Sequence, residues 1–132
     1  MVMKVDGYYY RYEDDHAILA SPQEAVASPA EDAQPRAEDI DALSQEIQAD
    51  TTLHVTRVRE AWTGLRTEAP DGVPVVGYDH TPGFFWLAGQ SGYGFQTSLG
   101  FACLAADLLV DGTAGEWVTA QSVRDLAPDR LR

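Results

Sequence analysis

The sequence has few of the features that mark secreted or membrane proteins. Its single cysteine, Cys103, cannot form a disulfide within the chain and is typical of proteins of the reducing cytosol. No run approaches the ~20 apolar residues that a membrane-spanning helix needs. Residues 1–7 lack the apolar core of a signal peptide. These absences predict a cytoplasmic protein without a membrane span.

Positive charge is also scarce. The 132 residues carry 21 acidic and 9 basic side chains, which gives a formal net charge of −12. Such a charge repels the phosphates of nucleic acids and anionic lipids, so neither is expected as a partner. Residues 1–50 hold twelve of the acids against three bases. We interpret this half as a solvated surface, and the alternative is a surface that meets another polypeptide.

Familiar metal and nucleotide motifs are missing as well. His16, His54 and His80 lack the spacing of a ligand set, so no metal site is predicted. The glycines of segment 89–94 stand in the wrong order for a G-x-G-x-x-G dinucleotide fingerprint. Ser91 lacks the glycine two positions later that a G-x-S-x-G nucleophile elbow requires, and no P-loop is present.

The pattern of the chain predicts one domain of the α+β class. Its composition and turn residues predict strands at 7–12, 17–20, 51–67, 73–78 and 84–88. The first two strands should form a hairpin, and all of them should share one antiparallel or mixed sheet. Three prolines in residues 21–36 predict an irregular connection, and Pro70-Asp71-Gly72 predicts a turn.

Helical spacing of apolar residues predicts two main helices. Residues 38–50 have one apolar stripe with acids opposite, which is typical of an amphipathic surface helix. Residues 95–111 have two apolar stripes, which predicts a buried helix that ends before Gly112. Cys103 lies in this second helix and is therefore expected to be buried and inert. A further short helix is expected around residues 116–126.

The candidate site lies between residues 62 and 97. Arg66 is the only lysine or arginine between Arg59 and Arg124. A guanidinium at this place suits a bidentate clamp on a carboxylate. The alternatives are an ordinary surface residue and a structural ion-pair partner.

Three glycines separate the predicted strand 84–88 from the long helix. Gly89, Gly92 and Gly94 would let a flat or anionic ligand approach the backbone, and would direct free N–H groups at it. Such amides stabilise negative charge that develops on a ligand. The alternative is a plain tight turn.

Several motifs in this order resemble the C-terminal part of the FAD-dependent amino-acid and amine oxidoreductases. This superfamily includes D-amino-acid oxidase, glycine oxidase and sarcosine oxidase, and the strongest likeness is to D-amino-acid dehydrogenases of the D-arginine type. The motifs are A-W-T-G-L-R-T (61–67), P-D-G-V-P-V-V-G-Y-D (70–79), G-F-F-W-L-A-G-Q-S-G-Y-G-F-Q-T-S (83–98) and A-P-D-R-L (127–131). The resemblance runs from about Tyr8 to Leu131.

The resemblance implies roles for two parts of the chain. In such enzymes the arginine of the G-L-R motif binds the substrate carboxylate over the flavin, and that role falls on Arg66. The loop after the last strand lies with the start of the last helix against the isoalloxazine ring. The implied cofactor contacts are Gln90, Ser91, Gly92, Tyr93, Gly94, Phe95, Gln96 and Thr97. The implied reaction is hydride transfer from the Cα of a D-amino acid or related amine to FAD.

The chain departs from the family pattern in two ways. Ser91 stands where relatives often have glycine. The N-terminal dinucleotide-binding unit, whose G-x-G-x-x-G turn holds the ADP half of FAD, is not found in the 132 residues. Residues 1–60 are therefore expected to be part of the substrate domain and residues 61–132 the flavin-facing part.

The missing unit leads to an expectation about partners. FAD should bind only with an N-terminal FAD-binding polypeptide, and a small amino acid is the expected substrate. Apolar surfaces left open should bind that polypeptide or drive self-association. One alternative is a non-catalytic truncated remnant that forms a small oligomer without flavin. Another is an unrelated module that binds a small ligand.

Overall fold

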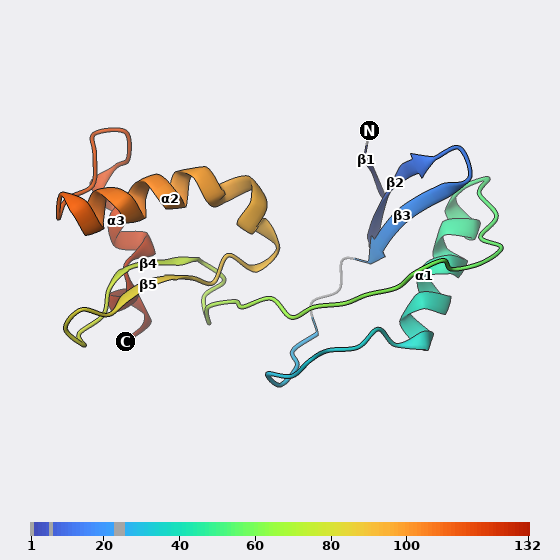
Figure 1. Cartoon of the computed structure of the whole chain (residues 1–132), viewed down its shortest axis with the longest axis horizontal. Coiled ribbons are helices and arrows are strands. Elements are labelled where there is room, and N and C mark those ends of the chain that lie inside the picture. The colour runs from blue at the N-terminus through green and yellow to red at the C-terminus, as the bar shows by residue number, and fades with distance from the viewer. Residues whose placement is uncertain (1, 6, 23–25) are drawn as a thin grey trace. The chain divides into compact units, whose positions relative to one another are not determined.

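A computed structural model describes residues 2–5, 7–22 and 26–132 of the chain (Figure 1). It contains two compact units, Met1–Leu65 and Arg66–Arg132. Each unit has its own antiparallel sheet and its own apolar core. The α+β class is confirmed, but the expectation of one shared sheet is wrong because the strands divide between the two units.

The first unit is a three-stranded sheet with one helix. Its elements are β1 (Val2–Val5), β2 (Tyr8–Asp14), β3 (Ala17–Pro22) and α1 (Ala37–Asp50). The strand order is β1-β2-β3 and both pairings are antiparallel. The hairpin of β2 and β3 and the helix α1 confirm the predictions, whereas β1 was not predicted.

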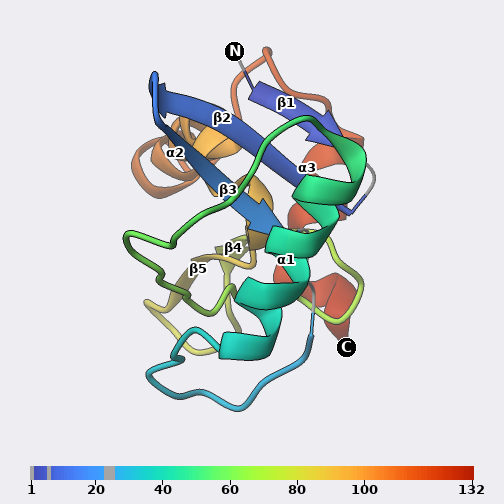
Figure 2. The ribbon, with the colours of Figure 1, turned by 90° about the vertical axis from the view of Figure 1, so that its right-hand side faces the viewer.

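The core of the first unit is small and partly aromatic. Tyr8 and Tyr10 are buried on β2, and Ile47 of α1 is buried with them. Leu43 also packs against this cluster, so the predicted apolar stripe of α1 faces the sheet. Figure 2 shows α1 close to β2 and β3. Most of the acids of the helix are exposed, which matches the pattern of an amphipathic surface helix.

The predicted strand at residues 51–67 is wrong. Residues 53–58 and 60–67 have no regular structure, and an isolated bridge between Glu68 and Gln90 follows them. Leu53 and Val55 pack against the first core, so these residues contribute packing rather than sheet pairing. Strand propensity measures how well side chains fit a pleated surface, and it forms no strand without a neighbouring one.

The second unit is built around a two-stranded hairpin. Its elements are β4 (Val75–Tyr78), β5 (Phe85–Ala88), the 3₁₀ turn η1 (Ser91–Tyr93), α2 (Gly94–Val110), α3 (Ala120–Leu126) and the 3₁₀ turn η2 (Pro128–Leu131). Val76 of β4 is buried against Leu104 and Ala105 of α2. The predicted strands and both helices of this region are confirmed.

Glycines lie at the two predicted chain reversals of this unit, the Pro-Asp-Gly turn and the end of α2. Gly72 has φ +73° and its amide donates to the Ala69 carbonyl at 2.9 Å, which confirms the Pro-Asp-Gly turn. Gly112 also has φ +73°, just after the Asp111 cap of α2. This left-handed conformation favours glycine, so both chain reversals follow from the sequence.

The prediction that α2 is buried is wrong for one of its two apolar stripes. Leu104 is buried in the core, but Phe95 is 99% exposed, Leu99 76% and Val110 80%. Cys103 is also exposed, contrary to the expectation that it is buried. The second unit supplies a partner for one stripe of the helix, and the other stripe faces outward.

This exposed helix also changes the expectation about membrane spans. Ser91–Val110 is 20 residues long with a mean hydropathy of 1.2, enough to cross a membrane by length and composition. The expectation that no run is apolar enough is therefore corrected. The same test is passed by core helices of soluble proteins, and 11% of this helix window is buried.

Candidate functional site

Arg66 lies against the glycine loop that follows β5. Its Nε atom is 3.7 Å, and its Cδ atom 3.9 Å, from the point where a Cβ atom on Gly92 would stand. The side chain is exposed. Across the ranges that the structure describes, no carboxylate forms an ion pair with Arg66. The guanidinium therefore keeps its charge available for a ligand.

Backbone contacts hold the Arg66 segment against the loop. The Ser91 amide donates to the Thr67 carbonyl at 3.1 Å. Next to this bond, Glu68 and Gln90 form an isolated antiparallel bridge. Because Thr67 directly follows Arg66, the two contacts fix the backbone from which the guanidinium projects.

The lack of a side chain matters for different reasons at Gly89 and at Gly92. Gly89 has φ +75°, and a Cβ atom there would lie 3.6 Å from both the Ala69 amide nitrogen and the Pro74 Cα atom. Its role is therefore close backbone packing. Gly92 is exposed and leaves room for the Arg66 side chain. A glycine at position 92 thus lets the cation and the loop backbone share one place on the surface.

Ser91 adopts a conformation that favours glycine. Its φ of +48° is the only positive value of a non-glycine residue in the described part of the chain. Such a backbone costs about 1–2 kcal/mol for a residue with a side chain. The structure thus gives a physical reason for the expectation that glycine suits this position.

α2 begins directly after η1, whose Ser91 and Tyr93 amides are not free, because they donate to the carbonyls of Thr67 and Gln90. No side chain caps its N-terminus, where Tyr93 is the capping residue. The hydroxyl of Thr97 donates back to the Tyr93 carbonyl at 2.8 Å and so does not compete for the amides. Tyr93 is 62% exposed and Phe95 is 99% exposed. A helix start of this kind attracts negative charge through its amides and its dipole.

A pocket of the second unit adjoins these residues without including them, since Thr67 and Gly89, the chain neighbours of Arg66 and Gln90, are part of its lining. It has a volume of about 300 Å³, and its lining includes Glu68, Asp79, Trp86 and Arg132. Neither Arg66 nor any residue from 90 to 97 belongs to the lining. The structure therefore brings Arg66 and Gly92 together on an open surface, without enclosing them in a cavity.

Asp79 links the β4–β5 hairpin to the C-terminal residue Arg132. Its carboxylate accepts a 2.9 Å hydrogen bond from the Trp86 indole and lies 3.3 Å from the Arg132 guanidinium. The Trp86 hydrogen bond lowers the pKa of Asp79. This cluster belongs to the packing of the hairpin, because each of its polar groups has a partner.

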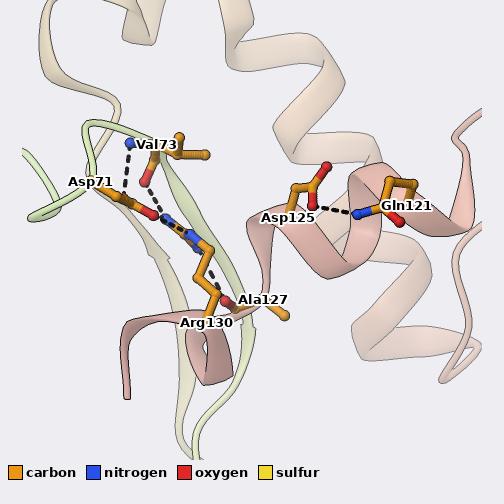
Figure 3. Close-up of polar contacts among 6 residues, drawn as sticks. All are labelled: Asp71, Val73, Gln121, Asp125, Ala127 and Arg130. Atoms are coloured by element: carbon orange, nitrogen blue, oxygen red, sulfur yellow. Dashed lines mark hydrogen bonds and ion pairs between the residues drawn. The ribbon is translucent and has the colours of Figure 1, made fainter.

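Sequence reasoning missed a second polar cluster around Arg130 (Figure 3). Arg130 lies in the A-P-D-R-L motif, which was matched to the family without a role. Its guanidinium Nε is 2.7 Å from one oxygen of Asp71, and its NH2 nitrogen is 3.2 Å from the other. Its hydrogen bond lowers the pKa of Asp71. The signal was an aspartate in one family motif and an arginine in another.

No group of three or more His, Cys, Asp or Glu side chains gathers among the described residues in a way that could hold a metal ion. His80 approaches one carboxylate, that of Asp129, at 3.9 Å. His16 and His54 are exposed in the first unit.

Comparison with known proteins decides the family. Residues 1–108 match the family model described as "FAD dependent oxidoreductase". The chain belongs to this family. A D-amino acid dehydrogenase of Cereibacter sphaeroides is 41% identical over 71 residues, which are 52% of this chain and 16% of that protein. One from Sinorhizobium medicae is 42% identical over 50 residues, 38% of this chain and 12% of that protein.

These matches confirm the relation to D-amino acid dehydrogenases, and the chain is a member of an FAD-dependent oxidoreductase family. The matched regions cover only 16% and 12% of the two relatives. Membership of this family implies the use of FAD. The activity of a whole relative does not follow for this chain from matches of this length.

Proposed function

We propose that this chain supplies the substrate-binding and flavin-facing portion of an enzyme that oxidises the C–N bond of a D-amino acid or a related amine. The observation that carries the proposal is the contact of Arg66 with Gly92, which puts a free guanidinium beside the loop. The printed names of the two relatives support the choice of a D-amino acid as substrate.

Arg66 would hold the substrate by its carboxylate. A guanidinium matches the two carboxylate oxygens with a planar pair of donors, which fixes both position and orientation. When bound, FAD supplies the hydride acceptor. The substrate Cα would lie between the clamped carboxylate and the ring, so that binding energy orients the bond to be broken.

Residues Gln90 to Thr97 would face the flavin ring. The uncapped start of α2 and the exposed backbone at Gly92 fit a flat ligand that carries negative charge when reduced. These residues suit the ring half of FAD only. The 132 residues contain no G-x-G-x-x-G turn for the ADP half.

We therefore propose that a dinucleotide-binding unit completes the site. It would be supplied by a separate polypeptide or by further residues of the same protein. Its docking surface would be the outer face of α2, defined as Phe95, Leu99, Cys103 and Val110, all of them exposed. Large exposed apolar patches of this kind mark interaction sites.

Co-expression tests the proposal. The partner would be the segment of a D-amino acid dehydrogenase that precedes its region similar to this chain. We expect a yellow complex that carries FAD and that Leu99→Glu prevents from forming. Val58→Glu is the matched control, because Val58 is 51% exposed but lies in the first unit. A colourless mixture of unassociated chains would refute the proposal.

A second candidate is a non-catalytic remnant that forms a small oligomer. The exposed outer face of α2 favours it as well, because a second copy could cover that face. This candidate predicts that the chain alone self-associates, that no flavin binds under any condition, and that Arg66→Ala has no effect in cells. Sedimentation of the purified chain with and without FAD separates the two.

A further inference from the structure

The C-terminal turn η2 is tied to the turn that follows the Arg66 segment. Arg130 and Asp71 are 59 positions apart, and two of the Arg130 nitrogens contact the two carboxylate oxygens at 2.7 and 3.2 Å. The guanidinium also donates to the carbonyls of Val73 and Ala127. With 15% of its side chain exposed, Arg130 is well sheltered for an arginine.

Asp71 is fixed from a second direction. Its Oδ1 atom accepts a 3.1 Å hydrogen bond from the Val73 amide, which closes the turn on itself. The turn is also closed by the bond from the Gly72 amide to the Ala69 carbonyl at 2.9 Å. The hydrogen bonds within the turn fix its geometry. The bidentate contact with Arg130 therefore determines where the whole turn lies.

The N-terminal end of this turn is continuous with the candidate site. Ala69 packs within 3.6 Å of the Cβ position of Gly89, and the two preceding residues bond to the loop through the Ser91 amide and the bridge to Gln90. Residues 66–69 thus run between two supports. The glycine loop is one, and the turn held by Arg130 is the other.

We propose that Arg130 is a positioning residue for Arg66. By holding Asp71, it keeps residues 66–69 in register with the glycine loop and so sets where the Arg66 guanidinium lies. The role of Arg66 toward a substrate rests on the proposed function, but its place beside Gly92 does not. The alternative is that Arg130 only adds stability to the second unit.

Nuclear magnetic resonance of the full chain tests the proposal without any flavin. The probes are the Nε–H signal of Arg66 and the backbone amide signals of Ser91 and Gly92. Arg130→Lys keeps the charge but loses the planar fork, so we expect all three signals to shift. Asp71→Asn should shift the same signals, because it removes the other half of the pair.

Two controls separate positioning from stability. Thr119→Ala removes the side-chain cap of α3, in which the Ser122 amide donates to the Thr119 hydroxyl at 3.0 Å, and should lower stability without moving the three signals. Gln121→Ala removes exposed hydrogen bonds with Arg124 and with Asp125, the second of which Figure 3 shows, and should change neither the stability nor the signals. Unshifted signals in folded Arg130→Lys and Asp71→Asn would overturn the proposal.

The positioning role and the proposed function can fail separately. If the three signals shift but the complex with a dinucleotide-binding unit holds no FAD, the clamp stands and the proposed function falls. If the complex holds FAD but the signals do not move, the proposed function stands and the positioning role of Arg130 falls. In an active complex, Arg130→Lys should raise the KM for the amino acid at least several-fold more than it lowers kcat.

Discussion

The Nε atom of Arg66 lies 3.7 Å from the place that a Cβ atom on Gly92 would occupy. The contact joins the segment before the hairpin to the loop after it, across about the distance of ordinary van der Waals packing. A side chain larger than alanine at position 92 would push the guanidinium away. A carboxylate clamped by Arg66 would therefore lie beside the loop backbone.

Ser91→Gly should stabilise the second unit. Ser91 has φ +48°, and replacing it should raise the free energy of unfolding by about 0.5–1 kcal/mol, because relief of the left-handed backbone exceeds the entropy cost of glycine. Ser98→Gly in the second turn of α2 is the control and should lower the free energy of unfolding by about 0.5 kcal/mol. Urea unfolding measures both. A less stable Ser91→Gly variant would contradict the assigned backbone strain.

Acid should weaken the clamp of Asp71 and Arg130. The hydrogen bond from Arg130 lowers the pKa of Asp71 below its ordinary value of 3.8, so the unfolded chain binds more protons in that range. The contribution to stability is complete above that value and is lost as the pH falls from there through the lowered folded-state pKa. Urea midpoints between pH 5 and pH 2 would show it.

The same experiment has an internal control. Asp71→Asn should flatten the acid side of the stability curve more than Arg130→Gln, because the Val73 amide still lowers the pKa of Asp71 when Arg130 is replaced. The double variant should be no flatter than Asp71→Asn alone. Asp14 and Asp79 also have lowered pKa values, from the His16 amide and from Trp86, so part of the slope should remain. Additive effects of the two single variants would show that the residues act separately.

Cys103 should react quickly with a thiol reagent in the folded chain. It is exposed on the outer face of α2, beside the exposed Leu99. Docking of a dinucleotide-binding unit over this face should slow the reaction at least tenfold, and Leu99→Glu should restore the fast rate. Ellman's reagent measures both rates. Equal rates in the presence and absence of the unit would place the docking surface elsewhere.

Local patterns predicted the elements well. The aromatic run at β2, the apolar stripe of α1 and the glycines at 72 and 112 each determine a structure through contacts within a few residues. The same patterns failed at residues 51–67, because a strand requires a neighbour that the local sequence does not encode. They failed again for the outer face of α2, because the spacing of apolar residues identifies an apolar face but not the chain that buries it.

The candidate site was predicted in part. The resemblance pointed to Arg66 and to the loop, and the structure brings Arg66 to Gly92 of that loop. The resemblance could not show that Arg130 binds Asp71, since that contact joins residues 59 positions apart. The roles of residues 90–97 toward a flavin remain predictions.

Flavin reduction by a D-amino acid tests the central claim most directly. In an anaerobic complex of this chain with a dinucleotide-binding unit, adding the amino acid should bleach the visible flavin absorbance. Arg66→Ala should slow bleaching at low substrate at least roughly tenfold, since a charge-assisted hydrogen bond contributes about 1.5–3 kcal/mol. Arg57→Ala, an exposed arginine of the first unit, should leave the rate unchanged. Equal bleaching rates in Arg66→Ala and the unaltered chain would contradict the claim.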